Sequence, residues 1–366
     1  MKTNLIFFLA RFGFGGAGNS VYRLASSLDT KKYEVHIICL GKCAYENNFH
    51  KKNIKVHKIK KKRLFFSALK LKKIVEKLTK NNKKNIFISN INYTNIFCAL
   101  IFMFNNKLKL IGFERTPIQE LEIYFNLIDF IKKNILKFLL KISYNRFDKI
   151  ICNSNYIVNQ LKSRYKIEST FIHPPSIIKS QNKIFKRKLK NKKFLNIVTI
   201  CRLSREKKIN EILLALNEIK NKRFIFHILG EGPEENKLKL LVNKLGLTKK
   251  VIFHGHIKNV NKILKSAHLY INSSYFEGFP NSVVEAAYMR VPIIASQSFG
   301  GINDILDKGK FGEFYYNGHK QLASKIEKYI FNPKKLIEKS KLCQKNILQF
   351  TLDNHIKKFK ILINEI

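Results

Sequence analysis

The sequence predicts an α/β protein with two Rossmann-like domains, each a doubly wound parallel sheet. Short apolar runs alternate with longer amphipathic runs, and this alternation is typical of parallel strands covered by helices. At 366 residues the chain is long for one core and suits two domains. The alternation halts at His173-Pro174-Pro175 and restarts at Phe194. We therefore expect a domain over residues 1–176, a linker over 177–193 and a second domain over 194–350.

In the first domain we expect five strands, with helices in most of the intervals. The apolar runs that predict these strands are Leu5 to Ala10, Val35 to Leu40, Ile86 to Ser89, Leu108 to Phe113 and Lys149 to Asn153. The first run is too short for the core of a signal peptide and ends in a glycine-rich turn, so it is interpreted as a buried strand.

The second domain repeats the alternation. Strands are expected near Ile197, Ile225, Val251, Leu269 and Ile293. In a doubly wound sheet the ligand crevice lies at the carboxyl ends of the strands. Residues 336–366 then predict two helices with a break near Phe350-Thr351.

Composition indicates a globular chain with a large positive charge. Hydrophobic residues make up 45% of the chain, the formal net charge is +45 and the isoelectric point is near 10.0. No apolar run approaches the ~18 to 20 residues of a membrane span. Six scattered cysteines without a Cys-x2-Cys pair indicate neither a zinc site nor a disulfide framework, and favour the reducing cytoplasm.

The charge favours an anionic partner, although codon bias in an AT-rich genome would also produce many lysines. Residues 55–73 and 131–147 mix lysines with large apolar residues, a pattern typical of segments in a membrane interface. An ordinary surface helix with a solvated lysine face is the alternative. The chain has no recognised nucleic-acid module. We therefore expect peripheral attachment to the anionic inner face of the plasma membrane, and no specific nucleic acid partner.

One segment carries most of the functional information. Glu277 and Glu285 stand eight residues apart, the first in an expected turn and the second just inside a helix. Gly278 and Pro280 stop the preceding strand, and Asn281 is expected to cap that helix. A helix N-terminus attracts anions, while a carboxylate beside it suits hydroxyl groups. The segment therefore fits a ligand with phosphates and a sugar diol, such as a nucleotide sugar.

This segment resembles the Glu-x7-Glu signature of glycosyltransferase family 4, whose members are retaining enzymes with the GT-B fold. Companion motifs occur in the family's order: Arg202-Leu203-Ser204-Arg205-Glu206-Lys207, Gly230-Glu231-Gly232-Pro233 and Gly300-Gly301-Ile302-Asn303-Asp304-Ile305. In the last motif Asp304 replaces the family's usual glutamate. The resemblance implies two domains facing a central cleft, with the C-terminal helix 351–366 packed back onto the first domain.

The resemblance also implies residue roles. Arg202 and Lys207 would neutralise the leaving diphosphate, Glu277 would contact the donor sugar, and Glu285 would accept hydrogen bonds from the ribose. Surface charge is the alternative for the two cations. Further donor-binding positions are expected at Gly16, Gly230, Gly278, Phe279, Pro280, Asn281 and Gly301.

A glycine-rich loop, Phe14 to Asn19, follows the first strand and opens a helix. Such a loop can present backbone amides to phosphate. Its glycine spacing does not match Gly-x-Gly-x-x-Gly, so a dinucleotide site is the weaker alternative. In the family this loop, which contains Gly16 here, reaches toward the donor phosphates and the acceptor.

The acceptor side departs from the family pattern. Many members carry a histidine near the end of a middle strand of the first domain, whereas Glu114-Arg115 follows that strand here. Glu114 is expected to act in catalysis at this place, with Arg115 as the other candidate. An ordinary surface pair is the alternative.

We therefore expect a retaining glycosyltransferase that moves a sugar from a nucleotide donor, a UDP-sugar, to a hydroxyl of a lipid-linked or surface glycan. No cofactor or metal is expected, and the chain lacks the Asp-x-Asp pair with which GT-A enzymes hold manganese. Two alternatives remain open. One is a GT-B sugar-nucleotide epimerase, and the other is a basic nucleic-acid-binding protein on an inactive transferase scaffold.

Overall fold

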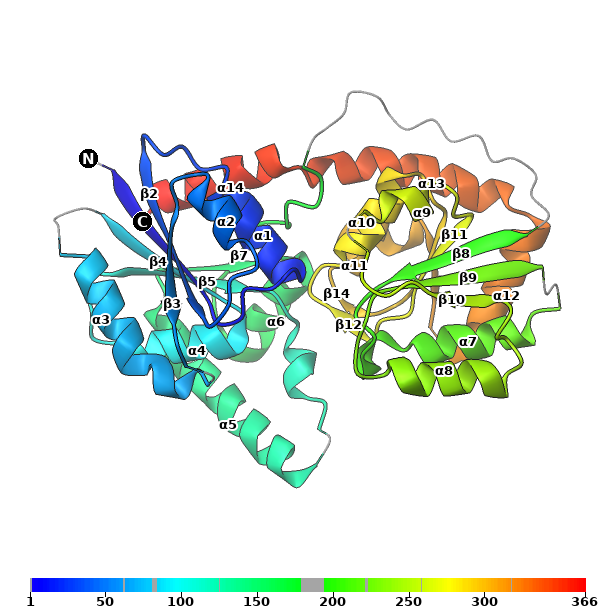
Figure 1. The fold of residues 1–366 in the computed structure, drawn as a ribbon, viewed down its shortest axis with the longest axis horizontal. Helices are drawn as coiled ribbons and strands as arrows, with labels where there is room; N and C mark the ends of the chain where they lie inside the picture. Colours follow the sequence, from blue (N-terminus) through cyan, green and yellow to red (C-terminus); the bar gives the residue numbers. More distant parts are fainter. Residues whose placement is uncertain are drawn as a thin grey trace. The chain divides into compact units, whose positions relative to one another are not determined.

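The computed structural model describes residues 2–61, 63–80, 84–124, 126–178, 194–220, 223–257, 259–316 and 318–366. The chain divides into two compact units, which we call unit 1 (Met1–Ile178 with Phe350–Ile366) and unit 2 (Lys179–Gln349). Each unit contains its own parallel sheet with helices packed against it (Figure 1). Most of the expected linker, residues 179–193, lies outside the described residues.

Unit 1 contains a seven-stranded parallel sheet in the order β3-β2-β1-β4-β5-β6-β7. Its strands are β1 (Thr3–Leu9), β2 (Tyr33–Leu40), β3 (Lys55–Ile59), β4 (Asn85–Asn90), β5 (Lys109–Glu114), β6 (Lys149–Cys152) and β7 (Thr170–Phe171). The five expected strands are all present. They are continuous apolar runs because the sheet buries both faces of these strands.

Two layers of helices cover this sheet. Helices α1 (Gly16–Ala25) and α14 (Leu352–Asn364) pack on one face, and α3 (Ala68–Leu78) and α4 (Asn92–Ile101) pack on the other (Figure 1). The other helical segments are α2 (Glu46–His50), α5 (Leu127–Ser143), α6 (Asn155–Tyr165), η1 (Phe65–Ser67), η2 (Ile118–Leu121) and η3 (Tyr144–Arg146).

The chain returns to unit 1 through its last helix, α14. Thr351 caps this helix, because its side-chain oxygen accepts a hydrogen bond from the Asn354 N–H. The ring of Phe359 packs against those of Phe7 and Phe113, at centroid distances of 6.4 and 6.2 Å. The expected break near Phe350-Thr351 is therefore present.

Unit 2 contains a six-stranded sheet in the order β10-β9-β8-β11-β13-β15 and a two-stranded sheet of β12 and β14. The strands are β8 (Leu195–Ile200), β9 (Phe224–Leu229), β10 (Val251–Phe253), β11 (Leu269–Asn272), β12 (Phe276–Glu277), β13 (Ile293–Ser296), β14 (Phe299–Gly300) and β15 (Glu313–Tyr315). These strands all pair in parallel with their neighbours.

Three helices, α7 (Ile209–Glu218), α8 (Glu235–Lys244) and α12 (Gly318–Phe331), pack on one face of the larger sheet, whereas α10 (Asn281–Tyr288) lies on the other (Figure 1). The remaining helical segments are α9 (Asn261–Leu264), α11 (Ile302–Leu306), α13 (Lys334–Asn346), η4 (Arg205–Lys207), η5 (Asp307–Gly309) and η6 (Ile347–Gln349).

Both sheets change winding direction once. In unit 1 the connections diverge between β1 and β4, and in unit 2 they diverge between β8 and β11. Doubly wound sheets bind ligands outside the carboxyl ends of the strands at such a switch point. These two places are where the functional residues should be sought.

The structure corrects two local expectations. Residues 55–59, the start of the basic stretch 55–73, form the edge strand β3, so the alternative of an ordinary surface helix is wrong for these residues. Its pairing with β2 holds this segment in the sheet. Glu277 was expected in a turn, yet it lies in the short strand β12, because β14 supplies a pairing partner that is distant in the sequence.

Candidate functional site

Lys207 and Glu277 meet at the switch point of unit 2. Lys207 ends η4, which follows β8, and Glu277 ends β12, which follows β11. The Lys207 Nζ lies 2.7 Å from the Glu277 Oε1, and the two side chains are only 15% and 16% exposed. The Ser274 hydroxyl donates to the same Oε1 at 2.8 Å. Two motifs about 70 residues apart in the chain therefore form one largely buried ion pair.

Two hydrogen bonds fix the loops that carry this pair. The Tyr275 N–H donates to the Glu206 carbonyl at 2.7 Å. The Ser273 hydroxyl donates to the Lys207 carbonyl at 2.6 Å. The loop after β8 and the loop after β11 are thus joined on both sides of the ion pair.

The paired glycines of the last motif join the same site. Glu277 pairs with Gly300 between β12 and β14, and the Gly301 N–H donates to the Glu277 carbonyl at 3.2 Å and to the Gly278 carbonyl at 3.1 Å. The Ser296 hydroxyl donates to the carbonyl of Ser274 at 2.6 Å. The structure therefore brings Lys207, Glu277 and Gly301 together.

The charge state of Lys207 follows from its surroundings. Burial disfavours the ammonium form, but the adjacent Glu277 carboxylate more than offsets this effect, and the pKa of Lys207 is raised. Lys207 is therefore a cation at neutral pH. Arg202 is exposed on the same loop and lies outside this ion pair.

Steric contacts explain the glycines in the loop after β9. Gly230 has a φ of +132°, and a Cβ there would lie 1.9 Å from the Cys201 carbonyl oxygen. A Cβ on Gly232 would lie 2.2 Å from the Leu203 carbonyl oxygen. Only glycine permits so close an approach. These residues let the loop pack directly on the one that carries Arg202.

The second glutamate, Glu285, is half-buried on α10. This helix begins at Asn281 with Pro280 as its N-cap residue, and no side chain caps it. The expected capping role of Asn281 is therefore wrong, because Asn281 is already the first helical residue. The Ser282 hydroxyl accepts from the Tyr270 hydroxyl at 2.8 Å, which anchors the first turn of α10 to β11.

The three residues between β12 and α10 are buried. Gly278, Phe279 and Pro280 all lie below the surface, and Phe279 is 6% exposed. The Phe279 ring is thus part of the packing of unit 2, so any contact of this residue with a ligand would come from its backbone.

In unit 1, Glu114 and Arg115 turn to different partners at the carboxyl end of β5. Glu114 is 2% exposed, and its carboxylate accepts from the Tyr144 hydroxyl at 2.5 Å and from the Arg115 N–H at 3.1 Å. The Arg115 Nε and Nη2 donate to the Asn90 Oδ1 at 3.0 and 2.9 Å, and its Nη1 donates to the Ser20 hydroxyl at 3.1 Å. The alternative of an ordinary surface pair is therefore wrong.

Burial changes the acidity of both groups. Desolvation raises the pKa of Glu114 to about 7, although the hydrogen bond from Tyr144 opposes it. Desolvation lowers the pKa of Arg115 to about 10, so this side chain is still a cation at neutral pH.

The glycine-rich loop folds tightly onto α1. Gly15 is the N-cap residue and Gly16 the first residue of this helix. A Cβ on Gly18 would lie 2.0 Å from the Gly13 carbonyl oxygen, so the turn requires glycine there. Asn19 donates from its side chain to the Phe14 carbonyl at 3.2 Å.

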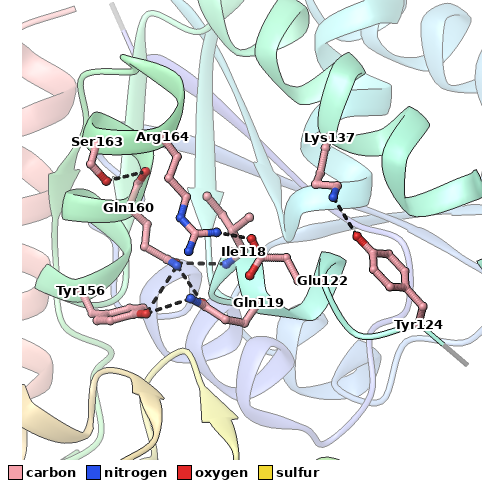
Figure 2. A network of polar contacts seen from close by, with 9 residues as sticks. All are labelled: Ile118, Gln119, Glu122, Tyr124, Lys137, Tyr156, Gln160, Ser163 and Arg164. Carbon is pink, nitrogen blue, oxygen red and sulfur yellow. Dashed lines mark hydrogen bonds and ion pairs between the residues drawn. The ribbon is translucent and has the colours of Figure 1, made fainter. Parts of the chain in front are cut away.

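A glutamine network that we did not expect from the sequence fixes the segment after Arg115 (Figure 2). The Gln160 Oε1 accepts from the Ile118 N–H at 3.1 Å, and its Nε2 donates to the Gln119 Oε1 at 2.7 Å. Gln119 in turn donates to the Tyr156 hydroxyl at 2.9 Å. These contacts tie η2 to α6. Single glutamines carry no sequence signal for such a network.

Among the residues that the structure describes, no group of three or more His, Cys, Asp and Glu side chains is arranged to hold a metal ion. None of the helices in this part of the chain combines the length and the apolar character that crossing a membrane requires.

Two doubly wound parallel-sheet units, with functional motifs at strand ends, define a protein of the GT-B class. The family model described as "Glycosyltransferase Family 4" matches residues 14–175, and the model described as "Glycosyl transferases group 1" matches residues 180–347. The chain therefore belongs to glycosyltransferase family 4, as its motifs predict.

Several glycosyltransferases are similar to this protein over most of its length. A Campylobacter jejuni alpha-1,4-N-acetyl-D-galactosaminyltransferase is 27% identical over 311 residues, which cover 82% of this chain and 81% of the relative. An N-acetylgalactosaminyltransferase of the same organism is 26% identical over 319 residues, with coverages of 83% and 84%. An uncharacterised glycosyltransferase of Methanocaldococcus jannaschii is 27% identical over 277 residues, with coverages of 70% and 67%.

Solved structures confirm the predicted fold class. Anabaena HepE in complex with UDP superimposes with a TM-score of 0.78 at 17% identity, covering 100% of both chains. Sucrose-phosphate synthase from Thermosynechococcus elongatus gives a TM-score of 0.81 at 14% identity, covering 100% of this chain and 99% of the neighbour. The protein is thus a glycosyltransferase with the GT-B fold.

Proposed function

We propose that this protein is a retaining, metal-independent glycosyltransferase that moves the sugar of a UDP-sugar to a hydroxyl of a lipid-linked glycan and releases UDP. The observation that carries the proposal is the Lys207–Glu277 ion pair at the switch point of unit 2. Its cation, Lys207, lies on the loop after β8 that also bears Arg202. HepE has been solved with UDP and with UDP-glucose, which supports a UDP-sugar donor. The Campylobacter relatives have undecaprenol-linked acceptors in their names, which supports a lipid-linked acceptor.

Each residue of the site has a proposed role toward the donor. Arg202 and Lys207 bind the diphosphate, Glu277 contacts the sugar hydroxyls near the anomeric carbon, and Glu285 accepts from the ribose diol. Backbone groups of the surrounding loops complete the donor site: Gly16, Gly230, Gly278, Phe279, Pro280, Asn281 and Gly301.

The proposed reaction proceeds on one face of the donor sugar. The acceptor oxygen bonds to the anomeric carbon as the bond to the nucleoside diphosphate breaks, and the departing phosphate takes the proton of the acceptor hydroxyl. Negative charge grows on the diphosphate, and fixed cations stabilise it most in a site with little water. Glu277 contributes by holding the Lys207 ammonium in place, since Lys207 alone would be a mobile side chain.

The expected catalytic role of Glu114 stays a prediction. Its carboxylate is buried and accepts a hydrogen bond from Tyr144, so it would have to turn away from this partner to touch an acceptor. In the conformation described here it is placed to position the backbone of Arg115.

We also propose that unit 1 attaches to an anionic membrane through α5. Large apolar side chains recur on this helix at intervals of three and four residues, so they share one face, and all are exposed: Leu127, Ile131, Ile135, Phe138 and Ile142. Lys132 and Lys141 are exposed beside them. Lys133 points the other way, is 7% exposed and pairs with Asp129 at 2.9 Å.

An exposed apolar face flanked by lysines is typical of a helix that lies in a membrane interface, with the apolar residues in the acyl region and the lysines at the head groups. The net charge of +45 adds a general attraction to anionic lipid. A lipid-linked acceptor would be reached from that surface.

A transfer assay tests the proposed reaction. The protein is incubated with single UDP-sugars, an undecaprenyl-diphosphate-linked glycan and EDTA, and the anomeric configuration of the product is read by NMR. The proposal predicts transfer with the donor's configuration retained. Inversion, or activity that EDTA abolishes and magnesium restores, would contradict the mechanism. Conversion of one UDP-sugar into another without acceptor would identify the epimerase instead.

A further inference from the structure

We propose that Arg115 is an anion-binding residue for a phosphate group of the acceptor, and that Glu114 positions it. The inference rests on the proposed function and assigns the chemistry of its acceptor side. Of the two candidates for the place of the family's histidine, the geometry points to Arg115 as the one that faces a ligand.

The guanidinium of Arg115 is held by neutral groups. Three of its five N–H donors bond to the Asn90 Oδ1 and the Ser20 hydroxyl, and its Cζ lies 5.0 Å from the centre of the Phe113 ring. Among the residues that the structure describes, Arg115 forms no ion pair. The charge of Glu114 acts on the guanidinium without a direct contact and does not offset burial, which lowers the pKa of Arg115 to about 10. Burying a cation that lacks a directly bonded anion is unfavourable, and an anionic ligand would reduce that cost. Guanidinium groups bind phosphate particularly well.

The place of Arg115 in the fold suits an anion. It bridges β5, β4 and α1, next to the switch point between β1 and β4. Ser20 is one helical turn from Gly16, where α1 begins. Helix N-termini attract anions, so the guanidinium and the start of α1 favour the same kind of ligand.

Buried polar atoms around Arg115 supply a second, independent observation. Asn153 donates to the Arg115 carbonyl at 3.0 Å, while its own Oδ1 has no partner among the described residues. The same holds for the Thr116 Oγ1 and the Ser154 Oγ. Native proteins rarely leave such atoms unbonded. Asn153 and Ser154 are both at least nine-tenths buried, so a polar ligand is expected to complete this cluster.

His355 adds an acceptor of the same kind. It is 3% exposed on α14, and its Nδ1 lies 2.8 Å from the His173 carbonyl oxygen. Its Nε2 has no partner among the described residues. Burial, followed by the nearby Arg115 cation, lowers the pKa of His355 to about 4, so the ring is neutral. A carbonyl oxygen only accepts, so Nδ1 is the donor to His173 and Nε2 is left as an acceptor.

The chemistry of the ligand follows from these groups. Arg115 requires negatively charged oxygens, whereas the Asn153 Oδ1 and the His355 Nε2 require O–H donors. A phosphate attached to a sugar offers both. We therefore assign this site to a glycosyl phosphate, the chemistry found where a glycan joins its lipid diphosphate carrier.

Glu114 acts on Arg115 through the backbone. Its Oε1 accepts from the Arg115 N–H and the Thr116 N–H, while its Oε2 accepts from the Tyr144 hydroxyl. The glutamine network of η2 and α6 holds the following residues (Figure 2). The turn is thus fixed on both sides, which is how binding sites keep a charged group in place.

The test is calorimetric binding of inorganic pyrophosphate in saturating UDP, with about 150 mM salt to screen the general surface charge. UDP occupies the proposed donor site, so the remaining binding reports a second site. We expect Arg115→Gln to weaken this binding about tenfold or more. The matched control is Arg146→Gln, which removes another largely buried arginine of unit 1 that bonds to the Phe102, Asn105 and Leu108 carbonyls. The control should bind like the wild type.

The outcomes separate the inference from the proposed function. Failure of UDP to bind would count against the donor site. Binding of UDP, with pyrophosphate binding equal in wild type and Arg115→Gln, would overturn the inference. If Arg115→Gln does not fold, the Arg115 Nε–H NMR signal of the wild type, assigned by its loss in Arg115→Lys, decides. A shift on adding pyrophosphate supports the site, and an unchanged signal overturns it.

Kinetics distinguish a lipid-linked phosphate from a free one. With a diphosphate-linked glycan as acceptor, Arg115→Gln should raise KM about tenfold or more, while KM for a phosphate-free glycan stays the same. An equal effect on both acceptors would mean that Arg115 supports the fold rather than the phosphate.

Discussion

At the scale of single residues, the Lys207–Glu277 pair matters for placement more than for net stability. Buried ion pairs contribute little against an apolar replacement, but removing one partner leaves an uncompensated charge. A single substitution should therefore destabilise unit 2, whereas removing both charges should not. Activity should follow a different rule, because the donor diphosphate needs the cation itself.

We predict that Lys207→Met lowers the free energy of unfolding by about 2 kcal/mol, somewhat below the usual cost of a fully buried broken pair, since both side chains are partly exposed. The double variant Lys207→Met with Glu277→Leu should regain most of that stability. Urea unfolding measures both effects. Sugar transfer should be lost in both variants, and recovery of transfer in the double variant would show that Lys207 only balances Glu277.

The raised pKa of Glu114 predicts a pH effect on stability. Its folded value of about 7 lies above its ordinary value of 4.5, so the folded protein binds this proton more tightly than the unfolded chain. The resulting stabilisation is fully present below pH 4.5 and is lost as the pH rises through 7. It amounts to ~3 kcal/mol at most.

Glu114→Gln removes this titration, because glutamine is neutral at every pH. The variant should lose less stability than the wild type between pH 5 and pH 7, by about 2 kcal/mol in urea unfolding. Histidines whose pKa is lowered in the folded protein, such as His36 and His355, titrate equally in both proteins and cancel in the comparison. Parallel curves for the two proteins would show that Glu114 is ionised throughout this range.

Residue contacts were the hardest feature to predict. The motifs indicated that Arg202, Lys207, Glu277 and Gly301 belong to one site, but not that Lys207 bonds to Glu277. That contact depends on the adjacency of β8 and β11, which is a property of the sheet order. The buried environment of Glu114 was also missed, since a Glu-Arg dipeptide has the same sequence on a surface and in a core.

At the scale of secondary-structure elements, the sequence predicted the strands that are buried on both faces of a sheet. The central strands of both sheets are apolar runs, and they were found where expected. The missed strands are short, as with β7, β12 and β14, or lie at a sheet edge, as with β3 and β15. Such strands depend on a pairing partner, so their own residues carry little signal.

Helix α5 gives a prediction at this scale. Replacing Ile131, Ile135 and Phe138 together by serine should abolish co-sedimentation with vesicles that contain anionic lipid. These side chains are between 51% and 64% exposed, so the free energy of unfolding should change by less than about 1 kcal/mol. Wild-type binding should weaken with rising salt, because lysines contribute to it.

The matched control replaces three apolar residues on other helices, Phe331, Leu342 and Ile361, which are 79%, 46% and 52% exposed. This variant should bind vesicles like the wild type. Equal loss of binding in both variants would show that general surface hydrophobicity, rather than α5, causes attachment.

At the scale of the whole molecule, two doubly wound units provide two switch points with different chemistry. Unit 2 places a cation and a carboxylate at its switch point, beside the start of α10. Unit 1 places a guanidinium there, beside the start of α1. This division fits a transferase in which one unit binds the nucleotide donor and the other binds the acceptor.

The net charge of +45 is also a property of the whole chain. It would attract nucleotides, lipids and nucleic acids alike, so binding of an anion by itself identifies no site. A donor site must show selectivity for one nucleotide and dependence on single residues.

The most direct measurement is therefore calorimetric titration of a panel of nucleotides and UDP-sugars in EDTA, with wild type, Glu285→Ala and Arg202→Ala side by side. We predict that UDP or one UDP-sugar binds the wild type without metal, and that each variant weakens this binding about tenfold or more. The absence of nucleotide binding by the folded wild type, or equal binding by all three proteins, would contradict the donor site in unit 2.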